Sequence, residues 1–429
     1  MHMKSQIIVL HALALLCLAP LAAVGQPAVL AVAMAPASAV AIGQSITMTV
    51  SASGSSLAYQ WKLDGANIPR ATGASYVLPM VGAAGRGSYQ VVVTGAGGTA
   101  TAEMGTLSVM SGDVRLMNLS GRAMIGTGSD VLIAGFVSQG DASSTNKNIL
   151  FRGMGPALGG MGGMSSGVLS NPVLTIYDGQ SSPMGGNMGW TNAPTRMTGG
   201  GASRVQTTMQ SVTQAMMNAL GAFTTGMSSA DSALMMNGPH GAYTAMMSGT
   251  GNSNAIGLVE CYDADAALGS GANTARLVNM SLRANVGPGT NGLIAGFVMI
   301  GGPSGSPGTV LLRAMGPGLA AMGVSGALPG PTMMLYDGNS RPIASNSGWS
   351  NGPMMATGVG ASTTRAAVVA ASMGMMASLG AFPPTPGSAD CAMVATLPAG
   401  AYTVVVSGLS DSSGRAMTGV VLCEVYEVR

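Results

Sequence analysis

The chain of 429 residues is long enough for roughly two to four domains, and it contains 66 glycines but only 7% charged residues. With 47% hydrophobic residues, it is too apolar for a disordered chain. A formal net charge of +2 without a basic run excludes the electrostatic pattern of a nucleic-acid-binding or anionic-membrane-binding surface.

The first 25 residues have the pattern of a secretory signal peptide. Lys4 precedes the apolar run "IIVLHALALLCLAPLAA", and the small residues "AVG" precede Gln26. A membrane anchor is the alternative, but Pro20 interrupts the run, and no later segment has the roughly 20 consecutive apolar residues of a spanning helix. The sequence therefore predicts an exported mature chain, secreted or held on the cell surface.

Residues 29–110 consist of short alternating runs separated by Gly, Asn and Pro, the pattern of a β-sandwich. Trp61 lies in "YQWKL", and Tyr89 stands two residues before Val91 in "GSYQVVV". This segment resembles an immunoglobulin-like domain. The resemblance implies that Trp61 is the core tryptophan, that Tyr89 is the tyrosine-corner residue, and that Val50 and Val91 replace the two cysteines. Packing alone would then hold the sheets together.

The rest of the chain is a duplication. "RLMNLSGRA" at 115–123 returns as "RLVNMSLRA" at 276–284, and the motifs "LIAGFV", "RxMGPxL", "YDG", "NxGW" and "AYTxxxSG" follow twice in the same order. The sequence predicts a first repeat at 113–265 and a second at 275–429, joined by the short flexible linker "AALGSGANT". Each repeat is expected to be a jelly-roll-like β-sandwich, so the whole chain is predicted to be all-β.

One stretch in each repeat has helical rather than strand periodicity. In residues 203–220, apolar side chains recur at spacings of three and four, and residues 363–379 form a comparable Ala- and Met-rich stretch. We expect one short covering helix in each repeat.

The repeated motifs resemble a tandem unit that follows immunoglobulin-like domains in large secreted bacterial proteins. More faintly, the second half of the unit is similar to the bacterial pre-peptidase C-terminal type of β-sandwich. This resemblance implies an extracellular module, and it brings no established enzymatic activity with it.

Few residues can carry chemistry. His240 is the only histidine outside the predicted signal peptide, and its counterpart is Ala399, which argues against a Ser–His or Cys–His catalytic pair and against histidine-rich metal sites. Recurrent acids leave three hypotheses open: structural pairing with recurrent arginines or turn capping, calcium coordination, and a hydrolytic carboxylate pair. The recurrent acids are Asp178, Asp231 and Glu260 with their counterparts Asp337, Asp390 and Glu424, and the recurrent arginines are Arg115, Arg122 and Arg152 with Arg276, Arg283 and Arg313. Structure is the favoured role, and the calcium candidates are Asp178, Asp231, Asp337 and Asp390.

Trp190 and Trp349 lie in Gly/Asn-rich loops, where each could stack on a sugar ring or cover the end of the sandwich, and we favour the covering role. Cys391 and Cys423 could form a disulfide across neighbouring strands, although the first repeat has Ser232 and Val259 there. The 36 methionines exchange with valine and leucine between the repeats, which indicates core filling rather than copper binding.

The sequence therefore predicts a secreted, non-catalytic adhesion or structural protein that binds an extracellular protein or polysaccharide and needs no cofactor other than, at most, calcium. A carbohydrate-binding accessory protein that uses Trp190 and Trp349 is the alternative. A glycoside-type hydrolase is the third and least favoured hypothesis.

Overall fold

The computed structural model describes residues 26–35, 39–41, 46–78, 87–110, 114–126, 130–140, 146–160, 167–197, 207–222, 227–250, 254–265, 275–289, 291–300, 307–362, 364 and 366–428. The predicted signal peptide and the linker at 266–274 lie outside these residues. The chain forms two compact units, the first made of Met1–Ala33, Met48–Tyr76 and Tyr89–Met104, and the second of Met34–Thr47, Val77–Ser88 and Gly105–Arg429. Almost all regular structure is β-strand, so the predicted all-β class is confirmed.

The N-terminal strands form two sheets, with the orders β1-β3-β6 and β2-β8-β7-β4-β5. Their bounds are β1 (Ala28–Ala35), β2 (Ala39–Ala41), β3 (Ile46–Ser53), β4 (Ala58–Leu63), β5 (Ala66–Asn67), β6 (Ser75–Leu78), β7 (Gly87–Gly95) and β8 (Gly98–Met110).

The core of this first sandwich has the residues that the immunoglobulin-like pattern implied. Trp61 is fully buried, lies opposite Val91 in the β4–β7 pairing, and donates its indole N–H to the carbonyl of Gly73 at 2.9 Å. Tyr89 and Val50 are also buried. The two valines therefore contribute apolar volume to this core.

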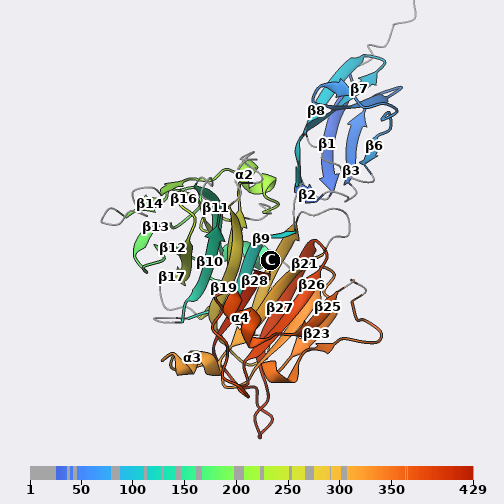
Figure 1. Ribbon diagram of the computed structural model, residues 1–429. Helices are drawn as coiled ribbons and strands as arrows, with labels where there is room; N and C mark the ends of the chain where they lie inside the picture. The colour runs from blue at the N-terminus through green and yellow to red at the C-terminus, as the bar shows by residue number, and fades with distance from the viewer. Residues whose placement is uncertain are drawn as a thin grey trace, which may run out of the picture. The chain divides into compact units, whose positions relative to one another are not determined.

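The strands of the two repeats run from β9 to β28, with three short α-helices and two 3₁₀ turns among the described residues (Figure 1). In the first repeat these are β9 (Arg115–Ile125), β10 (Leu132–Gln139), β11 (Lys147–Met154), η2 (Pro156–Gly160), β12 (Pro172–Asp178), β13 (Pro183–Asn187), β14 (Thr195–Arg196), β15 (Thr208–Gln210), α2 (Gln214–Ala219), β16 (Ser232–Gly238), β17 (Ala242–Gly249) and β18 (Ala255–Asp263). In the second they are β19 (Arg276–Val286), β20 (Leu293–Ile300), β21 (Gly308–Met315), α3 (Pro317–Ala321), β22 (Pro331–Asp337), β23 (Pro342–Asn346), η3 (Trp349–Asn351), β24 (Met354–Met355), β25 (Ala367–Ala370), α4 (Met373–Ser378), β26 (Cys391–Leu397), β27 (Gly400–Gly408) and β28 (Gly419–Val428).

The two repeats have the same strand pairing. Strand β11 lies between β16 and β18 in the first repeat, as β21 lies between β26 and β28 in the second. Strand β12 pairs with β13 and β17, as β22 pairs with β23 and β27. The duplication read from the sequence is therefore a duplication of topology.

The repeats also share their sheets. Strand β10 pairs with β17 of its own repeat and with β19 of the other, while β20 pairs with β27 and with β9. One row therefore reads β12-β17-β10-β19-β28-β21-β26 and the other β16-β11-β18-β9-β20-β27-β22. One buried apolar cluster contains side chains of both repeats, so they form a single folded body rather than two modules that could move independently.

The glycine of each "LIAGFV" motif lies at this junction. Gly135 is opposite Ser281 and Gly296 is opposite Ser120, and each serine hydroxyl donates to the glycine carbonyl at 3.4 Å. A Cβ on Gly135 or Gly296 would lie 2.6 or 2.5 Å from the serine Oγ. The motif therefore permits close approach between the repeats.

The prediction of helices over 203–220 and 363–379 is wrong in the N-terminal part of each range. Residues Thr208–Gln210 and Ala367–Ala370 pair as strands with β16 and β26. The helices α2 and α4 begin only after Thr213 and Ser372, whose hydroxyls accept the backbone N–H three residues later at 3.2 Å. These N-caps set the first residue of each helix. Only the C-terminal part of each expected helical range is therefore helical. Within the described residues, no helix has both the length and the apolar character needed to cross a membrane.

Candidate functional site

Asp231 and Asp390 are fully buried beside the short helical turns that follow the "RxMGPxL" motifs. Asp231 Oδ1 accepts the backbone N–H of Gly155 at 2.8 Å, and Asp390 Oδ1 accepts that of Gly316 at 2.7 Å. Asp390 Oδ2 also accepts the hydroxyl of Ser388 at 2.8 Å. Both carboxylates thus satisfy backbone donors that would otherwise be buried without partners.

Asp178 and Asp337 cap the hairpin turns of the "YDG" motifs. In each, Oδ1 accepts the backbone N–H groups two and four residues later, at 2.9–3.0 Å. Asp337 Oδ2 also accepts the hydroxyls of Ser362 and Thr364. Burial raises the pKa of Asp337, but these hydrogen bonds, that of Ser362 foremost, outweigh burial and hold it below its usual value.

Glu260 and Glu424 each belong to a buried triad with an arginine and a tyrosine. Arg152 Nε lies 3.3 Å from Glu260 Oε2, and Arg313 Nε lies 3.4 Å from Glu424 Oε2. The arginine and glutamate are opposite one another in the β11–β18 and β21–β28 pairings. The hydroxyls of Tyr262 and Tyr426 donate to the other carboxylate oxygen at 3.0 and 2.8 Å. Of the predicted structural pairings, this is the one that recurs in both repeats with the same geometry.

Burial dominates the electrostatics of the triads. It raises the pKa of Glu260 and Glu424, against the opposing effects of the arginine charge and the tyrosine hydrogen bond. It also raises the pKa of both tyrosines. The arginine and glutamate side chains of both triads are at most 6% exposed, so the triads lie almost entirely away from solvent.

The acids proposed for a hydrolytic pair, Asp178, Asp231 and Glu260, thus belong to three separate networks. Among the described residues, no three His, Cys, Asp or Glu side chains form a group that could hold a metal ion. The calcium hypothesis for Asp178, Asp231, Asp337 and Asp390 stays a prediction, and one oxygen of each of these carboxylates already accepts backbone N–H groups.

Trp190 and Trp349 are partly buried, and they pack against the apolar clusters that α2 and α4 cover. The backbone N–H of each donates at 2.6 Å to the carbonyl of Asp231 or Asp390. The indole N–H of Trp349 also donates to the carbonyl of Thr385 at 3.1 Å. This is the geometry of the covering role.

The predicted disulfide between Cys391 and Cys423 is not formed, and both thiols are free and buried. Ala314 of β21 is in register with Cys391 on one side and with Cys423 on the other. Two strand spacings, about 9–10 Å, exceed the roughly 7 Å limit for bridged Cα atoms. The Cys391 thiol instead contacts the carbonyls of Pro331 and Asn346, as the Ser232 hydroxyl contacts those of Pro172 and Asn187 in the first repeat.

His240 is exposed in the turn between β16 and β17. This is the position that the sequence predicted for it.

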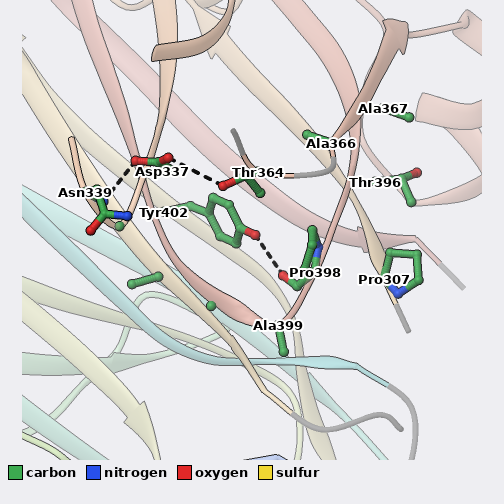
Figure 2. Close-up of a pocket in the computed structure, with 13 residues that line it drawn as sticks. Pro307, Asp337, Asn339, Thr364, Ala366, Ala367, Thr396, Pro398, Ala399 and Tyr402 are labelled. Carbon is green, nitrogen blue, oxygen red and sulfur yellow. Dashed lines mark hydrogen bonds between the residues drawn. The ribbon is translucent and has the colours of Figure 1, made fainter. Parts of the chain in front are cut away.

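A cavity of about 890 Å³ lies at one end of the second repeat (Figure 2). Alanine and proline form much of its wall, together with Asp337, Asn339, Thr396 and Tyr402. The Tyr402 hydroxyl donates to the carbonyl of Pro398 at 2.8 Å, which holds the ring beside the cavity. Its volume is in the range of small-molecule sites, and an apolar wall with a few polar groups is typical of them. The sequence analysis missed this cavity, because no motif marks it.

The first repeat has larger side chains at two of the corresponding positions. Strand register equates Thr208 with Ala367 and Asn237 with Thr396. Asn237 is bonded to the side chains of both Asn146 and Asn148, at 3.1 and 2.8 Å. Nearby in the first repeat, a small space lined by Met184, Arg196, Thr207 and Met209 has no volume for a water molecule. A comparison of the two copies for positions where a larger residue is replaced by a smaller one could have predicted the cavity.

No protein-family model matches the chain, and no curated protein sequence matches it. The solved structures include the N-terminal four Ig domains of Dscam1 isoform 4.44, with 19% identity, 20% of this chain and 21% of that chain covered, and a TM-score of 0.18. They also include the titin domains z1z2 in complex with telethonin, with 12% identity, 65% and 98% covered, and a TM-score of 0.19. The chain thus spans about a fifth of the Dscam1 fragment, and TM-scores this low carry no argument about function.

Proposed function

We propose that the protein is a non-catalytic binding protein that acts outside the cell in adhesion, matrix formation or surface assembly. The observation that supports this most is the use of its recurrent acids. Asp231 and Asp390 cap helical turns, Asp178 and Asp337 cap hairpins, and both glutamates neutralise buried arginines. The acidic side chains that are present in both repeats therefore stabilise turns and strand pairs.

Export is part of this proposal, and the signal-like first 25 residues support it. Expression of the full chain in a bacterial host with a general secretory pathway tests it by N-terminal sequencing of the exported protein. A mature N-terminus at Gln26 is expected. A chain that stays inside the cell and retains Met1 would contradict it.

The cavity of the second repeat is the ligand site in this proposal. It offers the amide of Asn339, the hydroxyl of Thr396 and the ring of Tyr402 beside apolar wall. A neutral carbohydrate is the ligand class that this mixture favours, because sugars present hydroxyl groups and apolar ring faces together. In this proposal the cavity is the carbohydrate-binding site, a role for which the sequence had offered Trp190 and Trp349 as the alternative.

A glycan array probed with the purified chain tests the ligand class. Ala367→Thr with Thr396→Asn introduces the residues of the first repeat and is expected to reduce binding at least tenfold. Trp349→Ala, outside the cavity, is the matched control and should retain binding. Binding lost with Trp349→Ala and kept in the filled variant would move the site to the loops, and release of sugar products would show a hydrolase.

A further inference from the structure

A second cluster of ionisable groups lies in the first repeat, apart from the triads and the cavity. Lys147, the first residue of β11, has its Nζ 2.5 Å from Asp263 Oδ1 and 2.8 Å from Asp265 Oδ2. The same Nζ donates to the carbonyl of Ala275 at 2.9 Å. The side chains of the three charged residues are only 1%, 0% and 4% exposed, so one ammonium and two carboxylates lie out of water.

The two carboxylates have different surroundings. Asp265 Oδ1 accepts both the backbone N–H and the side-chain N–H of Asn148, at 3.0 and 2.8 Å. Asp263 Oδ1 accepts the backbone N–H of Asp265 at 3.2 Å, but its Oδ2 is buried without a hydrogen-bond partner among the described residues. Both oxygens of Asp265 therefore have hydrogen-bond partners, whereas one oxygen of Asp263 has none among the described residues.

We propose that Lys147 and Asp263 condense to an intramolecular amide, with Asp265 as the group that moves the proton. The three groups are already in contact, so the reaction needs little further ordering. Burial favours the product, because a neutral amide replaces an ammonium and an incompletely hydrogen-bonded carboxylate that are costly to keep out of water.

The step balances without any external reagent. Asp265 Oδ2 takes a proton from the Lys147 ammonium, and the freed Nζ lone pair attacks Cγ of Asp263. The bond between Cγ and one carboxylate oxygen breaks. That oxygen leaves as water with two of the three ammonium protons, one of them relayed by Asp265, which ends as a carboxylate again. The amide nitrogen keeps the third proton, and nothing is oxidised or reduced.

The second repeat is an internal comparison. The pairing of Lys147 with Gly238 matches that of Gly308 with Leu397, so the lysine position holds glycine there. Asp263 corresponds to Glu427, which instead forms an ion pair with Arg276. Only the first repeat has the reactive set, and the bond would join the start of β11 to the end of β18.

The intact mass of the purified full chain, once its N-terminus is known, tests the proposal. The expected mass is lower than the sequence mass by one water. After denaturation and trypsin digestion, cleavage after Lys147 should be absent, and a branched peptide should join Lys147 to Asp263. A wild-type chain of full mass that is cleaved after Lys147 overturns the proposal, as does a branch to any residue other than Asp263.

Three variants separate the roles. Lys147→Arg keeps the positive charge but cannot form the amide, so it should have the full mass. Asp265→Asn should slow bond formation at least tenfold in chains that circular dichroism shows to be folded, and an unchanged rate would remove the proton-moving role. Lys62→Arg, in the first unit, is the matched control and should still lose one water. The wild-type mass decides the matter even if a variant fails to fold.

Discussion

Replacing Glu424 by glutamine in the buried triad of the second repeat is the sharpest test of the structural role given to the recurrent acids. The substitution keeps the size of the side chain but removes the charge that faces Arg313. Arg313 is fully buried, and its Nε is 3.4 Å from the carboxylate. The guanidinium would therefore remain in the core without a counter-charge.

The cost follows from this geometry. Two unit charges at this distance attract each other by about 5 kcal/mol at an effective dielectric constant of 20. Removing one partner of a buried pair costs about 3–5 kcal/mol, so we expect Glu424→Gln to lower the free energy of unfolding by about that amount. An unfolding entropy of about 2.1 cal/mol/K per residue over the roughly 350 residues of the second unit converts this to a fall in Tm of about 4–7 °C.

Urea unfolding and calorimetry of the full chain measure the effect. Glu260→Gln removes the equivalent charge in the first repeat and should cost a similar amount, while Glu103→Gln on the exposed face of β8 should stay within about 0.5 kcal/mol. Arg313→Met combined with Glu424→Leu should recover most of the loss, because no charge is then left unpaired. A loss below about 1 kcal/mol for both single glutamine variants would refute the reasoning.

Four further outcomes are expected. Gly296→Val should destabilise the second unit by about 1–3 kcal/mol in urea unfolding, because the new Cβ would clash with the Ser120 hydroxyl. Gly374→Ala, whose Cβ would have nothing within 4 Å, should not be destabilising. Equal effects of the two substitutions would contradict the close approach at Gly296. The described cysteines should not react with a thiol reagent at pH 8 until the chain is denatured, since burial raises the pKa of each and that of Cys391 to about 12; fast labelling of the native chain would contradict this. The pKa of Asp337 is lowered in the folded state, so its stabilising contribution is present above the unfolded-state pKa of about 3.9 and is lost as pH falls through the folded-state value. Asp337→Asn should therefore flatten the acid limb of stability, and an unchanged limb would argue against it. Chelator should leave Tm unchanged, because backbone N–H groups already bind one oxygen of each of the four predicted calcium carboxylates. A lower Tm in the presence of chelator would support calcium binding.

The sequence predicted the all-β class and the matching order of elements in the two copies, because the two copies could be compared within one chain. Two copies with one order of motifs must share a topology, and Trp61 and Tyr89 mark an immunoglobulin-like core through their size and spacing. The reason for one motif became visible only in three dimensions. A Cβ on Gly155 or Gly316 of "RxMGPxL" would lie 1.9 or 2.1 Å from a backbone carbonyl oxygen, a contact made by a segment distant from the motif.

The exchange of strands between the repeats could not be read from the sequence. Strand β9 would show the same alternation whether its neighbour were β10 or β20, because both have the sequence "LIAGF". The predicted length of the helices was wrong for a related reason. The apolar spacing of 205–220 suits a helix, but pairing of Thr208–Gln210 with β16 supplies hydrogen bonds that periodicity does not register.

The two copies differ most at one end of the sandwich, and this is where both proposals lie. In the first repeat, Asn237 is hydrogen-bonded to Asn148, and Asn148 is hydrogen-bonded to Asp265, which lies beside Lys147. Polar contacts therefore connect this end of the sandwich to the cluster of Lys147 and the two aspartates. In the second repeat, Thr396 stands at the Asn237 position and the space is open. A second copy that shares its sheets with the first can lose these contacts without losing its fold, since the shared strands still hold it. Duplication thereby lets one copy keep polar contacts between its strands while the other has an open pocket at the corresponding end.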